Sequence, residues 1–296
     1  MSRDGLSPSG PRFSEPDLPE RARNQFERAR TTCGTCRGYH SIYPYLRLSG
    51  VAGGVEADAP CLEPLLADML DARPLRLLIA GSADTGITAL VHRAAGDGIR
   101  RHQVLVVDRC ETPLAGCRAY ARSHGFDLRS VCCDLRELDR DQDITADLVL
   151  GHSILPFMDA DGRARVLSNL HDALAPGGRM VLATRLTAPG QQKAEAGRWT
   201  RESVQATRAR IRDALAVQGL PLPGDEAEFD ALVEDYAAHS NQSSAFGSTA
   251  ELEAELNEAG FEVSRWIEAG RGLAYLDDGT VRTGARPGWV AVTEPR

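Results

Sequence analysis

Short apolar runs alternate with longer amphipathic segments along much of this chain. At residues 75–80 an apolar run enters a turn of small residues, a helical segment follows, and a second apolar run ends in Asp108. A buried strand, a helix and another buried strand form a βαβ unit, whose two strands are parallel. The pattern therefore predicts an α/β fold that starts near residue 75.

The alternation continues to the end of the chain. Thr112 is the expected cap and Pro113 the first position of the next helix. The further elements that we predict are helix 112–124, strand 126–133, strand 146–150 running into a loop at 151–153, helix 161–174, strand 179–185, helix 248–260, strand 261–266 and strand 289–293. Ser248 and Glu251 fit a capping box at the start of the last helix.

Segments on both sides of this core extend the predicted fold. Residues 1–20 are polar and rich in proline, which predicts a disordered leader without a signal peptide. Residues 21–74 form an N-terminal helical segment. Residues 186–247 are too long for an ordinary connection, and helices at 200–217 and 225–236 predict a cap over the carboxyl-end crevice.

Three nucleotide ligands compete for the turn after the first strand. Gly81 and Gly86 have the spacing of a P-loop, but Ile87 stands where that motif needs lysine. A dinucleotide fingerprint needs a glycine at the position of Ala83. The third candidate is S-adenosylmethionine, which has no pyrophosphate.

The order of the motifs favours the third ligand. A glycine turn is followed by Asp108 after strand two, Asp134 after strand three, an active-site loop after strand four, and Pro-Gly-Gly at 176–178 before strand five. In this order the chain resembles the class I S-adenosylmethionine-dependent methyltransferases, from about residue 75 to 185. The resemblance implies a seven-stranded doubly wound sheet with strand seven antiparallel. Residues 75–185 would be the cofactor-binding core, and residues 248–296 would complete it.

The same resemblance implies cofactor-binding roles for particular residues. Asp108 would hold the ribose hydroxyls, and Asp134 the adenine amino group. The remaining implied contacts are Ala80, Gly81 and Ser82 near the methionine end, Leu135 beside the adenine ring, and His152 and Ser153 facing the sulfonium or the acceptor.

The glycine turn departs from the family pattern. Ile79 stands where the family has an acid, and Ala83 and Thr85 replace two glycines, so that Gly86 would take over one role. The expected function is methyl transfer to a small molecule by in-line displacement. Aminocarboxypropyl transfer, cyclisation of the cofactor and a non-catalytic binding module stay as alternatives, and a nicotinamide oxidoreductase is disfavoured because Asp134 would have no role there.

Charge and hydropathy limit the partners. The 296 residues carry 34 Lys and Arg against 42 Asp and Glu, a net charge of −8, which disfavours nucleic acid as a partner. No apolar run has the roughly 18 residues of a membrane span. We expect a small-molecule acceptor, no nucleic-acid or membrane partner, and a monomer or homodimer.

Cysteine use raises a separate question. Cys33 and Cys36 have the C-x-x-C spacing of metal sites and of redox dithiols. A zinc site needs about four ligands, and the only other close pair is Cys132 and Cys133 in a predicted strand. Two reduced cysteines are favoured over structural metal and over a redox pair, so no metal site is predicted. The odd cysteine count fits a reducing cytoplasm.

Candidate catalytic residues lie in the loop after strand four and in the N-terminal segment. His152 is the first choice for a general base because that loop opens at the crevice. His40 is the second, and Tyr39 belongs to a cluster of tyrosines whose hydroxyls can orient an acceptor. Trp199, Tyr236 and His239 are candidates for the cap lining, although core packing is favoured for each.

Overall fold

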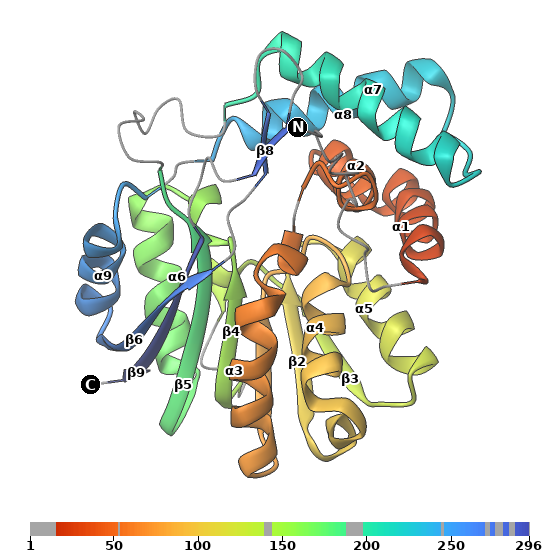
Figure 1. The fold of residues 1–296 in the computed structure, drawn as a ribbon. Coiled ribbons are helices and arrows are strands. Elements are labelled where there is room, and N and C mark those ends of the chain that lie inside the picture. The colour runs from red at the N-terminus through yellow and green to blue at the C-terminus, as the bar shows by residue number, and fades with distance from the viewer. Residues whose placement is uncertain are drawn as a thin grey trace, which may run out of the picture.

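A seven-stranded sheet forms the centre of the molecule (Figure 1). The computed structural model describes residues 16–52, 54–138, 144–187, 198–243, 246–269, 273–275, 281–283 and 288–295. The strand order is β3-β2-β1-β4-β5-β9-β6. The strands are β1 (Arg76–Ala80), β2 (Gln103–Asp108), β3 (Leu128–Cys132), β4 (Ala146–His152), β5 (Leu174–Arg185), β6 (Phe261–Ala269) and β9 (Gly288–Pro295).

The pairing of these strands confirms the predicted fold. β1 lies between β2 and β4, and all the pairs from β3 to β5 are parallel. β9, the predicted strand seven, pairs antiparallel with both β5 and β6. In a parallel sheet the carboxyl ends of the strands share one edge, so the residues after β1, β2, β3 and β4 meet there.

Two helical layers cover the sheet because its apolar side chains alternate between the faces. Leu77 and Ile79 of β1 join one core cluster, whereas Leu78 and Ala80 join the other. The first face carries α3 (Ala59–Ala72), α4 (Gly86–Ala95) and α5 (Glu111–Ser123). The second face carries α6 (Ala160–Asp172) and α9 (Thr249–Glu258).

A third cluster forms the cap, drawn above the carboxyl edge of the sheet in Figure 1. Its helices are α1 (Leu18–Thr32), α2 (Arg37–Leu48), α7 (Arg201–Val217) and α8 (Glu226–Ser240). α7 and α8 lie where the sequence predicts two helices, and Thr200 and Asp225 are their N-caps. The predicted N-terminal segment is therefore divided: α1 and α2 join the cap, while α3 packs on the sheet.

Several predicted boundaries need correction. α1 begins at Leu18 inside the predicted leader, because Pro19 suits the first turn of a helix; residues 1–15 lie outside the described part. Cys110, not Thr112, is the N-cap of α5. β5 already starts at Leu174, so the Pro-Gly-Gly segment lies inside this strand and does not precede it. At this segment the register between β5 and β4 shifts, between the β4 residues Ala146 and Leu148.

Short elements that the sequence did not predict complete the described chain. They are a hairpin of β7 (Leu273–Tyr275) and β8 (Val281–Thr283), and the 3-10 turns η1 (Gly54–Ala57), η2 (Gly96–Arg101), η3 (Leu135–Glu137) and η5 (Leu155–Phe157). The predicted cap segment also includes residues 188–197 and 244–245, which lie outside the described residues.

Candidate functional site

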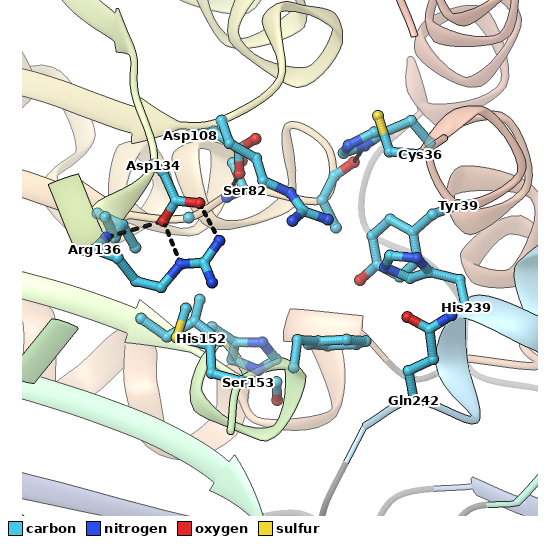
Figure 2. A pocket seen from close by; sticks show the side chains of 18 residues that line it. Cys36, Tyr39, Ser82, Asp108, Asp134, Arg136, His152, Ser153, His239 and Gln242 are labelled. Carbon is cyan, nitrogen blue, oxygen red and sulfur yellow. Dashed lines mark hydrogen bonds and ion pairs between the residues drawn. The ribbon is translucent and has the colours of Figure 1, made fainter. Parts of the chain in front are cut away.

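A cavity of about 240 Å³ lies between the carboxyl edge of the sheet and the cap. Figure 2 shows side chains from both walls pointing into it. The sheet side contributes Gly81, Ser82, Ala83, Asp108, Arg109, Asp134, Leu135, Arg136, His152, Ser153, Ile154, Phe157 and Met158. The cap side contributes Cys36, Tyr39, His40, His239 and Gln242.

Gly81 forms the floor of the cavity after β1. Its φ is +75°, a conformation that residues with a Cβ rarely adopt. A Cβ atom at this position would lie 2.6 Å from Cγ2 of Ile154. Glycine is therefore required here, both for the backbone conformation and because Ile154 occupies the space that a Cβ would need.

Asp108 is held at the end of β2 by two backbone groups. The N–H of Ser82 donates to Oδ2 at 2.9 Å, and the N–H of Cys110 donates to Oδ1 at 2.8 Å. Burial raises the pKa of Asp108 above 3.8, against the opposing effects of these hydrogen bonds and of His40. Each oxygen keeps a second lone pair, so the carboxylate can accept two hydroxyl groups.

Asp134 has a salt-bridge partner two residues further on. Arg136 donates from Nε to Oδ1 at 3.0 Å and from Nη2 to Oδ2 at 2.6 Å, as Figure 2 shows. The side-chain hydrogen bonds of Arg136 lower the pKa of Asp134, which stays ionised. The pair presents an acceptor and a cation on the same wall of the cavity.

His152 is oriented by a buried carboxylate. Its Nε2 lies 2.8 Å from Oδ2 of Asp58, and Arg185 donates to the same oxygen at 2.9 Å. Because a carboxylate only accepts, Nε2 carries the proton and Nδ1 is left as an acceptor. Ser153 follows with φ of 55°, the only positive φ of a non-glycine residue in the described part. Such strain is common at functional sites.

Aromatic rings form the cap wall. Tyr39 stacks on Tyr43 at 5.6 Å and on Tyr236 at 5.4 Å between ring centroids. It also contacts the rings of His239 at 5.1 Å and Phe157 at 5.7 Å. Burial raises the pKa of Tyr39 well above 10, so its hydroxyl stays protonated and can donate a hydrogen bond but not act as a general base.

His40 connects the cap to the glycine loop, which is the segment 81–85 between β1 and α4. Its Nδ1 lies 3.2 Å from the carbonyl oxygen of Ala83, to which it donates. Burial lowers the pKa of His40, but a hydrogen bond with the Cys110 side chain and the charges of Cys110 and Asp108 outweigh it and raise the pKa. A raised pKa keeps the His40 imidazole protonated to higher pH, which weakens it as a candidate general base.

Some predicted residues lie outside the cavity wall. Ala80 is fully buried in the second core cluster. Gly86 donates its N–H to Oδ1 of Asp84 at 2.8 Å and lies against Arg47, so it faces a buried ion pair and not the cavity. Tyr236 and Trp199 pack behind Tyr39 in the cap cluster, whereas His239 reaches the cavity.

Sequence reasoning missed other lining residues. Arg109 directly follows Asp108, and Arg136 lies two residues after Asp134, so the rule that ligands bind at strand ends could have found them. Phe157 and Gln242 carry no sequence signal, because only the packing of the cap on the sheet brings them to the cavity.

Three cysteines meet beside the cavity. Sγ of Cys110 lies 3.5 Å from Sγ of Cys33 and 3.7 Å from Sγ of Cys36. The Cys33 thiol also lies 3.0 Å from the hydroxyl of Thr112. Hydrogen bonds with Cys110 and Cys33 lower the pKa of the Cys36 thiol, so a thiolate is favoured within this group.

Comparison with known proteins identifies the central part of the chain. Residues 82–178 match the family described as "Methyltransferase domain". Two curated relatives are both called carboxy-S-adenosyl-L-methionine synthase. The protein of Shewanella sp. (strain W3-18-1) is 30% identical over 91 residues, 29% of this chain and 35% of the relative. That of Shewanella sediminis (strain HAW-EB3) is 32% identical over 103 residues, 31% of this chain and 40% of the relative.

Solved structures agree on the fold. The 1,6-didemethyltoxoflavin-N1-methyltransferase of Burkholderia thailandensis, with S-adenosylhomocysteine bound, has a TM-score of 0.51 at 17% identity, over 87% of this chain and 90% of that one. An O-methyltransferase family 2 protein of Planctomyces limnophilus, in complex with apigenin, has a TM-score of 0.50 at 16% identity, over 92% and 62%. Residues 82–178 thus match a methyltransferase domain, and the strand order with the antiparallel β9 is that of the predicted class I fold.

Proposed function

We propose that the chain binds S-adenosylmethionine in the cavity and transfers its methyl group to a small molecule. The observation that carries this proposal is the position of Asp108, whose two oxygens are fixed beside the glycine loop. The curated relatives are matched over less than half of their own length, so their activity is considered only for the second candidate function below.

The residues present fit this cofactor. Gly81 lines the cavity, and Asp108 can accept the two ribose hydroxyls. Asp134 has lone pairs left beside Arg136 to accept an adenine amino group, and the Leu135 backbone lies on the same wall. When bound, the cofactor supplies a methyl group activated by the positive charge on sulfur.

The acceptor side is aromatic and has a candidate base. Tyr39, Phe157 and His239 offer ring faces, which suit a flat acceptor. Nδ1 of His152 takes the proton that the acceptor loses, and Asp58 stabilises the resulting imidazolium through Nε2. The bound cofactor would supply the methyl group and leave as S-adenosylhomocysteine. Ser153 lies beside His152 and shapes the same wall.

Arg109 favours a second candidate function, in which the cofactor itself is modified. Arg109 lines the cavity, and within the part of the chain that the structure describes it has no hydrogen-bond or ion-pair partner. A cation at this position can hold an anionic co-substrate. The relatives named carboxy-S-adenosyl-L-methionine synthase support this alternative. Aminocarboxypropyl transfer and cofactor cyclisation would use the same cavity.

No helix in the described ranges combines the length and apolar character of a membrane span. None of the seven cysteines, all of which lie in the described ranges, forms a disulfide. This supports a location in the reducing cytoplasm. Both features are compatible with the proposed small-molecule activity.

Product mass distinguishes the candidates. The full chain is incubated with S-adenosylmethionine labelled with deuterium in the methyl group, together with pools of phenolic, amine and carboxylate compounds. Methyl transfer gives an acceptor that carries the label and an equal amount of S-adenosylhomocysteine. A labelled cofactor of increased mass, without S-adenosylhomocysteine, would contradict methyl transfer and support the second candidate.

A pair of variants tests the base. His152→Gln is expected to lower kcat by about 100-fold or more, the usual effect of losing a general base. Asp58→Asn should lower kcat less and change its pH profile, since it acts only through His152. Full activity of His152→Gln would remove His152 from the mechanism.

A further inference from the structure

Cys33, Cys36 and Cys110 come from three separate positions in the fold. Cys33 follows α1, Cys36 is the N-cap of α2, and Cys110 is the N-cap of α5. The first two belong to the cap, and the third belongs to the sheet domain. Their Sγ atoms all lie within 4.8 Å of one another, so packing of the cap on the sheet brings three thiols together.

The spacing of the thiols suits a tetrahedral metal ion. Zinc binds thiolate sulfur at about 2.3 Å, which places two sulfur ligands about 3.8 Å apart in a regular tetrahedron. The separations of 3.5 Å and 3.7 Å from Cys110 to Cys33 and Cys36 are close to that value. Reduced cysteines packed as ordinary apolar side chains have no reason to converge on one point.

His40 is the candidate for a fourth ligand. Its side chain interacts with that of Cys110, although its ring nitrogens lie outside the group of three sulfur atoms that are within 4.8 Å of one another. Nδ1 of His40 donates to the Ala83 carbonyl at 3.2 Å, which leaves Nε2 for a metal. A metal-bound histidine commonly donates its other ring N–H to a backbone carbonyl in this way, and the bond fixes the ring. Thr112 supplies a similar contact to Cys33 at 3.0 Å.

We propose that Cys33, Cys36, Cys110 and His40 bind one zinc ion that fastens the cap to the cofactor-binding edge. Binding replaces the three thiol protons, which pass to solvent, and no electron is transferred. Three thiolates and one imidazole fill the tetrahedron, so the ion is structural and leaves no position for substrate. Because the Cys110 N–H also holds Asp108, the ion would fix the backbone that presents the ribose-binding carboxylate.

This inference is independent of the proposed methyl transfer, and its test does not need an acceptor. The full chain, freed of any affinity tag and passed through buffer with a weak chelator, is analysed by inductively coupled plasma mass spectrometry. We expect about one zinc per chain, a tetrahedral site being filled by one ion. Replacement by cobalt should give the intense visible and near-ultraviolet absorption of tetrahedral cobalt thiolates.

Variants locate the ion. Cys36→Ser and Cys110→Ser should each lose most of the bound zinc, whereas Cys61→Ser, which changes a cysteine on α3 outside the cluster, should keep it. Zinc content equal in all four proteins would overturn the proposal, as would wild-type protein without zinc after expression in zinc-supplied medium. A disulfide between Cys110 and Cys33 or Cys36, found by peptide mapping without reduction, would also overturn it. The wild-type measurements keep their meaning even where a variant fails to fold.

Discussion

The two walls of the cavity are built in different ways. On the sheet wall, Ser82 and Cys110 hold Asp108 through backbone N–H groups, and Arg136 holds Asp134 from two residues away. On the cap wall, Tyr39 contacts rings from α8 and η5, far away in the sequence. The two carboxylates of the sheet wall are thus fixed by hydrogen bonds at the strand ends, and the ring of Tyr39 is fixed by packing against other rings. Side chains of the cap can change without disturbing the proposed cofactor contacts.

A few polar contacts join these two walls. Arg47 of α2 is fully buried and forms ion pairs with Glu56 and with Asp84, next to the glycine loop. Gln25 of α1 donates to the Ala83 carbonyl at 2.9 Å. Each of these contacts between the two walls can be removed by a single substitution.

Removal of the buried arginine is expected to have the largest effect. Arg47→Met leaves the carboxylates of Glu56 and Asp84 without their partner, and breaking a buried ion pair costs about 3–5 kcal/mol. The free energy of unfolding, measured in urea, should fall by this amount. Arg100→Met, which removes an exposed ion pair with Asp97, should change it by less than about 1 kcal/mol. Equal effects would mean that Arg47 does not anchor the cap.

A substitution in the glycine loop is expected to have the next largest effect, a loss of cofactor affinity. In Gly81→Ala the new methyl group meets Ile154 at 2.6 Å and the backbone has a positive φ, so cofactor affinity should fall at least about tenfold. Gly177→Ala is the matched control, because φ is +74° but nothing lies within 4 Å of the added atom. It should cost stability only. Unchanged affinity for S-adenosylhomocysteine in Gly81→Ala would move the cofactor away from this loop.

Substitution of the central ring should affect only the cap wall. Tyr39→Ala removes the stacking on Tyr43 and Tyr236, and aromatic pairs contribute about 0.5–1.5 kcal/mol each, so KM for the acceptor should rise about tenfold. Tyr39→Phe keeps the rings and should have a smaller effect. The Kd for S-adenosylhomocysteine should stay the same in both variants. A parallel loss of cofactor affinity would show that the walls are not independent.

Protonation of Asp108 on the sheet wall is expected to have the smallest effect, a gradual loss of affinity for S-adenosylhomocysteine. Burial raises the pKa of Asp108 above 3.8, and hydroxyl groups are accepted best by its ionised form. Affinity for S-adenosylhomocysteine should therefore be constant near neutral pH and fall as the pH drops through the raised pKa, earlier than for an exposed aspartate. Asp108→Asn should bind more weakly and show little of this pH dependence; an identical profile in the variant would assign the titration to another group.

The two walls also differ in how far the sequence predicts them. The strands, Gly81, Asp108 and Asp134 follow from apolar alternation and from the rule that strand ends meet at one edge. Gly86 lies away from the cavity, and nothing in the sequence indicates that Asp84 and Arg47 occupy the space beside it. The sequence did not predict the cysteine cluster for a similar reason, because 74 residues separate Cys36 from Cys110. Contacts between distant segments depend on packing, which residue patterns do not encode.

The central claim is that Asp108 holds the ribose of S-adenosylmethionine. Calorimetric titration of the full chain with S-adenosylmethionine and with S-adenosylhomocysteine tests it most directly, beside the Asp108→Ala variant. We predict one binding site in the wild type and a loss of about 100-fold or more in the variant, since two hydrogen bonds to a charged group contribute about 3 kcal/mol or more. Absence of binding to the wild-type chain, or equal binding by the variant, would contradict the account.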